Sequence, residues 1–405
     1  MNATSTVTSP MPNTQEMDFK ALSRLPSLDG WRAISIILVL GGHCHRTVGF
    51  PLKLDPLFRW VFDGDLGVRT FFIISGFLIT WLMLVEHERI GRVSLWRFYA
   101  RRALRILPVY VAFLCVLATL QVFTPYQQSA RVWTANVTFT TNFLTNGVGW
   151  TSGHLWSLAV EEQFYLLWPS IFVLSGVARN LRTSLTILSL PICIAPVARV
   201  VSYLSRHGSS TFAFIGPLSS SYSFFNYFDS LAIGCACAML LARKRDLIQH
   251  WMTSWSRIVV LIAFTLIIVP YVLNRWFLAG YLTPPFSSNY PALRPAMVLM
   301  QGALPLGSTC QAFGLAMILM QSVIFPRLGL YPLLNQPIIC RIGVLSYSIY
   351  IWQQIFCTDP QVFGLSGVWW MSFPFWLIPV FMVATASYYG LEQPLFRLRT
   401  HLREV

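Results

Sequence analysis

The chain has 405 residues, of which 55% are hydrophobic and 11% are charged, and its mean hydropathy is +0.58. Soluble proteins carry about 25% charged residues, so this composition excludes an ordinary soluble domain and favours a polytopic membrane protein. The net charge of +14 does not indicate a nucleic-acid-binding face, because the basic residues cluster in short connections between apolar segments. The eight cysteines show neither a CxxC pattern nor the spacing of metal ligands, so we expect no metal site.

The two ends of the chain differ from its apolar middle. Residues 1–26 begin with a polar stretch rich in Thr, Ser and Pro, and they lack the apolar run of a signal peptide. We expect a disordered cytoplasmic tail at 1–26, a transmembrane domain over 27–400, and a short cytoplasmic tail at 401–405.

Ten apolar segments are candidates for membrane-spanning helices, which need about 20 predominantly apolar residues each. The sequence therefore predicts an all-α polytopic membrane protein. The eighth segment is overlong and contains Pro305 and Gly307, so we expect it to be broken or tilted, and the ninth is short. The ten segments are 30–49, 67–85, 106–123, 154–175, 184–204, 223–241, 258–279, 296–325, 342–357 and 368–390.

Basic residues alternate between the connections of these segments. The connection after the second segment alone holds Arg89, Arg92, Arg97, Arg101, Arg102 and Arg105, whereas the connections near 124–150 and 280–295 hold few. Lys and Arg are retained on the cytoplasmic side of a membrane. Ten spans with both termini in the cytoplasm satisfy this rule in every connection.

The first candidate site is a helix face in the first segment. Arg32 and His43 are 11 residues apart, which is about 1,100° of helix and so about 20° past three full turns. Asp29 falls on the same face, whereas His45 lies on the opposite side. An ionisable residue inside a membrane is a functional candidate, and His43 suits a general base near neutral pH. The alternative is that His43 is a hydrogen-bonded packing residue.

The second candidate site lies in "HLWSLAVEEQFYLLWP". His154, Ser157 and Glu161 lie within about 60° of one another on a helix, and Glu162 is rotated by about 100° from Glu161. A carboxylate in this position is suited to support a histidine on another helix. The alternative for both glutamates is a structural ion pair with an arginine.

The third candidate site is the cluster of Arg101, Arg102 and Arg105 in "RFYARRALRILP". Adjacent like charges are unfavourable alone and become useful when a phosphate bridges them. The alternative is plain anchoring at the cytoplasmic face. Weaker signals are Arg69, Asp229 and Glu392, for which we expect at most a supporting role. Glu392 has Arg397 and Arg399 within pairing distance along the chain. Ser75 and Gly76 are more suited to close helix packing.

Seven motifs occur in order along the chain: "LDGWRAISIILVLGGH", "GVRTFFIISGFLIT", "FYARRALRILPVY", "HLWSLAVEEQFYLLWP", "YFDSLAIGCACA", "LSYSIYIW" and "EQPLFR". Together they resemble the membrane-bound acyltransferase-3 family over about 27–400. Members of that family O-acylate bacterial surface polysaccharides, peptidoglycan, lipid-linked sugars and some macrolides.

The resemblance implies a ten-helix core, acetyl-CoA or another acyl-CoA as cytoplasmic donor substrate, and no permanently bound cofactor. The family's pattern of Arg, ten residues and His matches Arg32 and His43, and the His is the proposed catalytic residue. Its arginine motif matches Arg102 and Arg105, and its first motif glutamate matches Glu161.

Two positions depart from the family pattern. Gln353 stands where a His is frequent after the "SYSIYLW" motif, so a proton-transfer role there is lost while hydrogen bonding remains. Arg69 stands where relatives often have an acidic residue, which changes the local charge balance.

We therefore expect an O-acyltransferase of the bacterial inner membrane that moves an acyl group, most often acetyl, to a hydroxyl of a carbohydrate-type acceptor. His43 would act as general base, Glu161 or another acid would support its imidazolium, and Arg32 would orient the donor or the supporting network. A covalent acyl-histidine relay is a second route. The alternatives are acylation of a macrolide-type molecule, a transporter for a lipid-linked sugar, and a non-catalytic membrane scaffold. The sequence indicates neither the acceptor nor the oligomeric state.

Overall fold

The computed structural model describes residues 25, 27–144, 146–176, 180–206, 220, 222–276 and 294–395. Apart from Leu25, the tails predicted at 1–26 and 401–405 lie outside the described residues. Within the described ranges, the long elements are all helices, and the β-structure is a single isolated bridge between Val48 and Ser372. The all-α prediction is confirmed for this part of the chain.

Each of the ten apolar segments contains a long helix. Shorter helices connect them, namely α2 (Asp55–Val61), α5 (Ala130–Val137), α6 (Trp150–Gly153), α10 (Arg245–Ser254) and α14 (Tyr331–Leu334). The ten long helices are α1 (Leu28–His43), α3 (Gly64–Ile90), α4 (Leu95–Phe123), α7 (Leu155–Leu174), α8 (Leu181–Arg206), α9 (Phe228–Arg243), α11 (Ser256–Trp276), α13 (Arg294–Ile324), α15 (Pro337–Phe356) and α16 (Leu377–Ser387).

Five stretches in the described residues are long and apolar enough to cross a membrane: Leu52–Ile90, Leu95–Phe123, Leu181–Ser202, Ser256–Arg275 and Leu306–Ile324. These support the membrane character of the protein. The other long helices are shorter or more polar. The 16 residues of α1 or α9 rise about 24 Å, less than the thickness of a hydrocarbon core of about 30 Å. Ten complete spans and cytoplasmic termini therefore remain predictions.

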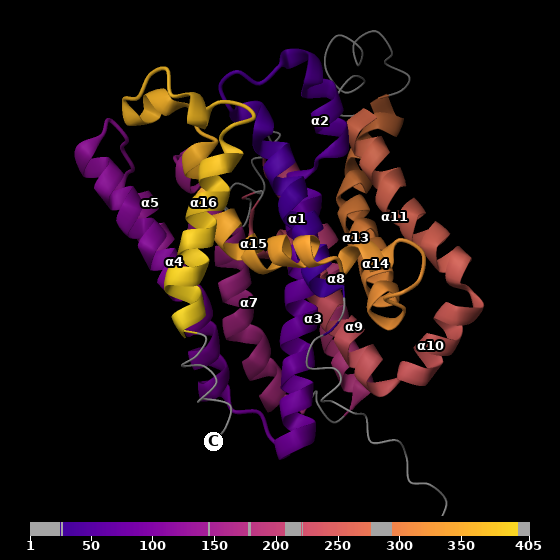
Figure 1. Cartoon of the computed structure of the whole chain (residues 1–405). Helices are drawn as coiled ribbons and strands as arrows, with labels where there is room; N and C mark the ends of the chain where they lie inside the picture. Colours follow the sequence, from indigo (N-terminus) through magenta and orange to yellow (C-terminus); the bar gives the residue numbers. More distant parts are fainter. Residues whose placement is uncertain are drawn as a thin grey trace, which may run out of the picture.

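The helical connections gather at two ends of the bundle, as the alternation of basic residues predicts. In Figure 1 the turn between α3 and α4 and the helix α10 lie at the lower end. Arg89 is in the last turn of α3, Arg92 is in the connection that follows, and Arg245 is the first residue of α10. The helix α2 and the connection from α15 to α16 lie at the upper end. The first end is the one that the sequence predicts to face the cytoplasm.

Caps define both ends of α3 and the start of α4. The Asp63 carboxylate accepts from the backbone N–H of Leu66, 3.0 Å away, at the start of α3. Gly91 ends the helix with a φ of +74°, a conformation that favours glycine. The Ser94 hydroxyl then accepts from the N–H of Arg97 and starts α4. This hairpin brings the arginine cluster of α4 back beside α3.

The closest packing joins α3 to α9 through a reciprocal pair of glycines. A Cβ on Gly76 would lie 2.1 Å from the carbonyl oxygen of Leu231, and a Cβ on Gly234 would lie 2.1 Å from that of Ile73. No side chain fits at either position, so the backbones touch as they do at small-residue contacts in membranes. The packing role predicted for Gly76 is confirmed.

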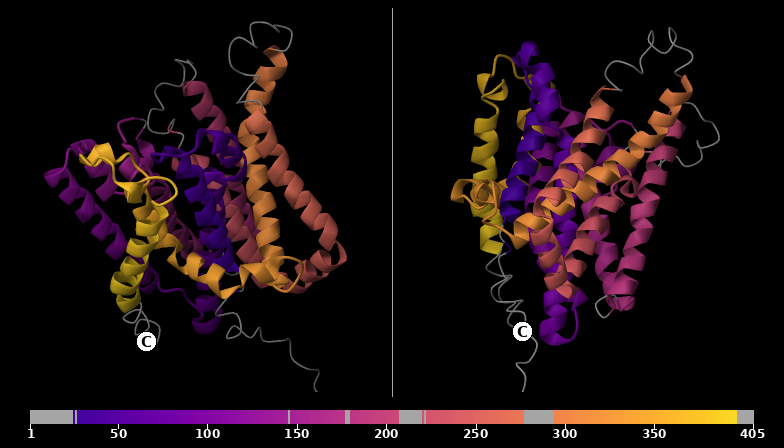
Figure 2. Two further views of the ribbon diagram at one scale, coloured as in Figure 1. Left: turned by 45° about the horizontal axis from the view of Figure 1, so that its top comes forward. Right: turned by 90° about the vertical axis from the view of Figure 1, so that its right-hand side faces the viewer.

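The helix α1 is held between α3 and α15, again through glycines. A Cβ on Gly67 of α3 would lie 2.6 Å from the carbonyl oxygen of Ser35, and one on Gly343 of α15 would lie 1.8 Å from that of Asp29. Figures 1 and 2 show that α15 runs across the bundle rather than along it. The ninth predicted span is therefore a helix, but its axis is transverse to that of its neighbours.

The eighth segment was expected to be broken or tilted, and the structure shows a tilted helix without a break. Helix α13 is continuous over Arg294–Ile324, and the right-hand view of Figure 2 shows it running obliquely. Gly307 fits against Pro270 of α11, because a Cβ there would lie 2.8 Å from the Pro270 Cβ. Glycine in this segment serves contact with α11 rather than a break.

Candidate active site

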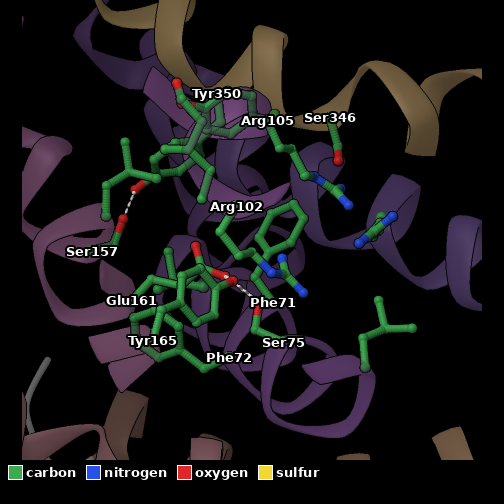
Figure 3. Close-up of a pocket in the computed structure, with 16 residues that line it drawn as sticks. Phe71, Phe72, Ser75, Arg102, Arg105, Ser157, Glu161, Tyr165, Ser346 and Tyr350 are labelled. Atoms are coloured by element: carbon green, nitrogen blue, oxygen red, sulfur yellow. Dashed lines mark hydrogen bonds between the residues drawn. The ribbon is translucent and has the colours of Figure 1, made fainter. Parts of the chain in front are cut away.

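A first cavity is lined by residues of α1, α3, α4, α7 and α15. We call it the arginine cavity because it contains Arg32, Arg102 and Arg105. Figure 3 shows Arg102 and Arg105 pointing into the same space as Ser75 and Glu161. Three helices far apart in sequence thus bring three guanidinium groups and one carboxylate together. Such a set is suited to hold a phosphate-bearing molecule.

Glu161 is held inside this cavity by two hydroxyl groups. Ser75 and Tyr165 both donate hydrogen bonds to its Oε1 (Figure 3 marks the bond from Ser75). The guanidinium of Arg102 lies over the ring of Tyr165, 4.8 Å from its centroid. Among the described residues Glu161 has no ion pair, so the alternative of a structural ion pair with an arginine is not what the structure contains.

The other arginines of the predicted site have different neighbours. Arg32 pairs with Asp29 across 3.4 Å and lines the arginine cavity. Arg101 pairs with Glu86 across 2.7 Å and is not among the lining residues of this cavity. The structure therefore does not bring Arg101 together with Arg102 and Arg105 in this cavity, and its binding of acyl-CoA stays a prediction.

A second cavity is lined by His43 at the end of α1 together with His154, Trp150, Trp156 and Arg46. We call it the histidine cavity. The helix α1 therefore contributes Arg32 to one cavity and His43 to the other, and their separation along the helix is about 16 Å. His45 is exposed and is not among the lining residues.

His43 is positioned by a glutamine and a tryptophan. Its Nδ1 lies 2.9 Å from Oε1 of Gln353 on α15, and its ring meets the ring of Trp150 edge to face at 4.8 Å. An amide oxygen only accepts hydrogen bonds, so this placement of the Gln353 amide favours the tautomer with the proton on Nδ1 and the lone pair on Nε2. This is the tautomer that a general base needs at Nε2.

The structure corrects the expected partner of His43. Glu161 was predicted to support its imidazolium, but Glu161 is bonded to Ser75 and Tyr165 in the arginine cavity. Gln353 occupies the place next to Nδ1 instead. The helical face that carries His154, Ser157 and Glu161 extends from one cavity to the other. His154 lines the histidine cavity and Glu161 lines the arginine cavity, so the two residues contact different partners.

His154 differs from His43 because both of its ring nitrogens are engaged. Nδ1 lies 2.7 Å from Oε1 of Gln354, and Nε2 lies 3.0 Å from the carbonyl oxygen of Ile351. Ser157 bonds to the hydroxyl of Tyr350 at 2.6 Å. These contacts tie α7 to α15, and they give His154 a positioning role rather than that of a base.

The two cavities share a wall. Val68 of α3 and Tyr350 of α15 line both of them. The Tyr350 hydroxyl is fixed by Ser157 and by the backbone carbonyl of His154, 3.1 Å away. The boundary between the two cavities therefore includes one valine and one tyrosine.

The remaining predicted residues form buried contacts around the cavities. Arg69 pairs with Asp65 across 2.7 Å and stacks on Tyr227. Asp229 is buried and bonds to Arg199 and Thr309. This places both Arg69 and Asp229 in a structural network between α3, α8, α9 and α13.

Two glutamates remain. Glu392 is buried and accepts from Ser348, while Arg397 and Arg399, its expected partners, lie outside the described residues. The Oε1 of Glu162 is buried and has no hydrogen bond to any residue that the structure describes. Neither glutamate lines the arginine or the histidine cavity.

Several residues of the two cavities were not predicted from the sequence. Tyr165 follows Glu161 by one helical turn, and Tyr350 lies within the "LSYSIYIW" motif, so both signals were present. Arg46 and Trp150 belong to connections with no periodic pattern. Arg46 is only three residues after His43 in the sequence, whereas the fold alone brings Trp150 to His43.

Comparison with known proteins points to one family. The family model described as an acyltransferase domain matches residues 25–392. The O-acetyltransferase OatA of Staphylococcus aureus (strain NCTC 8325 / PS 47) is 27% identical over 409 aligned residues, which cover 93% of this chain and 59% of OatA. A putative O-acetyltransferase, SACOL0978 of Staphylococcus aureus (strain COL), is 25% identical over 352 residues, covering 82% of this chain and 51% of that protein.

The chain thus spans between half and three fifths of the length of these relatives. No solved structure matches it significantly. The family model covers both cavities, with Arg32, His43, Arg102, Arg105 and Glu161 inside the matched range. On this evidence the chain belongs to the acyltransferase family that the model describes.

Proposed function

We propose that this protein is an integral membrane O-acyltransferase that moves an acetyl group from cytoplasmic acetyl-CoA to a hydroxyl of a carbohydrate-type acceptor. One observation carries the proposal: a single helix, α1, presents Arg32 to a cavity rich in arginine and His43 to a second cavity across a shared wall. The family and its O-acetyltransferase relatives support acyl transfer as the chemistry.

The donor would bind in the arginine cavity. Arg102 and Arg105 face it from the end of the bundle that the sequence predicts to be cytoplasmic, and they are suited to the phosphates of CoA. Arg32, one helix away, adds a third positive charge. The thioester would then extend past Val68 and Tyr350 towards His43.

The acceptor would bind in the histidine cavity, with its hydroxyl at Nε2 of His43. His43 takes the hydroxyl proton as the oxygen attacks the thioester carbonyl carbon. The C–O bond forms, the C–S bond breaks, and the CoA thiolate leaves and recovers the proton from the imidazolium. Gln353 accepts from Nδ1 throughout and so keeps Nε2 available.

The acceptor class is tested by labelling. Membranes that contain the protein are incubated with acetyl-CoA carrying a radioactive acetyl group, and surface glycans, lipids and small molecules are separated. Label in saccharides is the expected result. Label in macrolide-type molecules would instead identify those molecules as the acceptor class. A transporter or scaffold would leave no covalent label in any fraction above that of membranes lacking the protein.

A further inference from the structure

We infer that the histidine cavity binds an acidic saccharide, and that Arg46 holds its anionic group next to the hydroxyl that is acylated. This inference rests on the proposed function and narrows its acceptor. It depends on the position of Arg46, on the balance of charge in the cavity, and on the aromatic walls.

Arg46 and His43 flank the same tryptophan. The guanidinium carbon of Arg46 lies 5.0 Å from the centroid of the Trp150 ring, and the His43 ring meets that indole at 4.8 Å. Both side chains line the histidine cavity. The guanidinium of Arg46 and the ring of His43 therefore each lie about 5 Å from the Trp150 indole, a distance of about the width of one sugar residue. A charge on the saccharide that bears the reacting hydroxyl would reach Arg46.

Arg46 is exposed and makes no ion pair with any residue in the described ranges. The acidic residues outside those ranges are Glu16, Asp18 and Glu404, all near the chain ends. A guanidinium held over an aromatic ring by a cation–π contact still has N–H groups that can donate, and its planar fork fits a carboxylate or phosphate. Arg46 is thus a preorganised anion site without a partner in the described part of the chain.

Asp65 also lines the cavity and has to be considered, since it would repel an anion. Its Oδ2 accepts from Arg69 across 2.7 Å, and its Oδ1 accepts from the Tyr227 hydroxyl across 2.8 Å. The charge of Asp65 is therefore balanced by Arg69, which is buried beside it. This leaves Arg46 as the unbalanced charged side chain among the described lining residues.

The walls of the cavity suit a sugar ring. Trp156 and Tyr222 stack with their ring centroids 4.6 Å apart and their planes within 24° of each other, and both line the cavity. Aromatic faces of this kind pack against the C–H faces of pyranoses, while polar groups nearby set the orientation. A cavity that has these aromatic walls together with one unbalanced cation and one histidine fits an acidic sugar better than a neutral one.

Binding is tested first, without the donor. Purified protein in nanodiscs is titrated with methyl glucuronide, glucose 1-phosphate and methyl glucoside, and binding is followed by saturation-transfer NMR and tryptophan fluorescence. The two acidic probes should bind at least about tenfold more tightly than the neutral one, as expected for a charge-assisted hydrogen bond. The carboxylate and phosphate arms show which anion Arg46 prefers.

Three variants connect this preference to Arg46. Arg46→Gln should remove the preference for acidic probes, Arg46→Lys should retain part of it, and added salt should weaken it because the site is exposed. Arg59→Gln is the matched control, since Arg59 is an exposed arginine paired with Asp55 and outside the cavity. A preference that survives Arg46→Gln, or equal binding of acidic and neutral probes by the wild type, overturns the inference.

Acetyl transfer is then measured with the same saccharides. The ratio of kcat/KM for the acidic over the neutral acceptor should fall about tenfold in Arg46→Gln and hold in Arg59→Gln. Acidic probes that bind through Arg46 but receive no acetyl group would leave the binding inference standing and overturn the proposed function. Transfer that prefers neutral acceptors would overturn the inference and leave the transferase proposal standing.

Discussion

His43 and Gln353 lie 2.9 Å apart, Nδ1 to Oε1, although they are 310 residues apart in the chain. This pair fixes the imidazole tautomer, because only a protonated Nδ1 can donate to an amide oxygen. It also replaces the carboxylate partner that is common beside catalytic histidines. A neutral acceptor still orients the ring, which makes Gln353 a positioning residue for the proposed reaction.

Replacing Gln353 should lower turnover while acetyl-CoA still binds. Gln353→Met removes the acceptor from Nδ1 at similar side-chain length, so kcat should fall about tenfold or more. Gln353→Glu keeps an acceptor oxygen in place and should retain most of the activity. The measurement is steady-state transfer together with the Kd for acetyl-CoA. Full turnover by Gln353→Met would show that the hydrogen bond does not position His43.

The arginines of α4 should differ in their effect on the donor. Arg102→Gln combined with Arg105→Gln removes two charges from the arginine cavity and should weaken CoA binding by about a hundredfold, with a steep salt dependence in the wild type. Calorimetric titration with CoA measures this.

The matched control for that experiment is Arg101→Gln. Arg101 is a neighbour in sequence, but it pairs with Glu86 instead of lining the cavity. Its substitution should leave the CoA affinity within about twofold, since rim and surface charges contribute little. Equal losses at all three arginines would mean that they act only as a cluster of positive charge at the membrane surface.

The shared wall should govern the length of the acyl group. Val68→Ala enlarges the passage between the cavities and should raise the rate with butyryl-CoA relative to acetyl-CoA. Val109→Ala is the control, because Val109 is fully buried in α4 and lines neither cavity. The ratio of the two initial rates is the measured quantity. An unchanged ratio in Val68→Ala would place the route of the acyl group elsewhere.

The glycine contact between α3 and α9 should be intolerant of any side chain. Gly76→Ala would place a Cβ 2.1 Å from the Leu231 carbonyl oxygen and should destabilise the fold by about 1–3 kcal/mol, the usual cost of overpacking. Gly390→Ala meets nothing within 4 Å and should have little effect. Thermal unfolding of the two purified variants in the same detergent compares them. A Tm for Gly76→Ala equal to that of the wild type would contradict the close packing.

Hydrophobic periodicity and loop charge predict the helices well, because membrane helices must be apolar and their basic connections stay on one side. A helix was therefore found in every apolar segment. The direction of α15 could not be predicted, since a transverse helix in a bundle has the same composition as a spanning one. Pro305 and Gly307 left a break and a tilt of α13 equally open, and the structure has the tilt, with Gly307 accommodating Pro270.

Residues on one helix were placed more successfully than pairs on different helices. Helical geometry places Arg32 and His43 on one face of α1. In the structure, this face lines the arginine cavity at Arg32 and the histidine cavity at His43. Local sequence does not specify which helices face each other in the bundle. For this reason Glu161 was assigned to His43, although Ser75 and Tyr165 are its neighbours, and the contact of His43 with Gln353 was missed.

The most direct test of the account is acetyl transfer by His43→Ala in purified form, measured together with CoA binding. Labelled acetyl-CoA and a saccharide acceptor are supplied to the wild type and to the variant in proteoliposomes. The account predicts that transfer falls to the background rate while the Kd for CoA stays within about twofold, since His43 lies outside the arginine cavity. Transfer by His43→Ala at a rate near that of the wild type would contradict it.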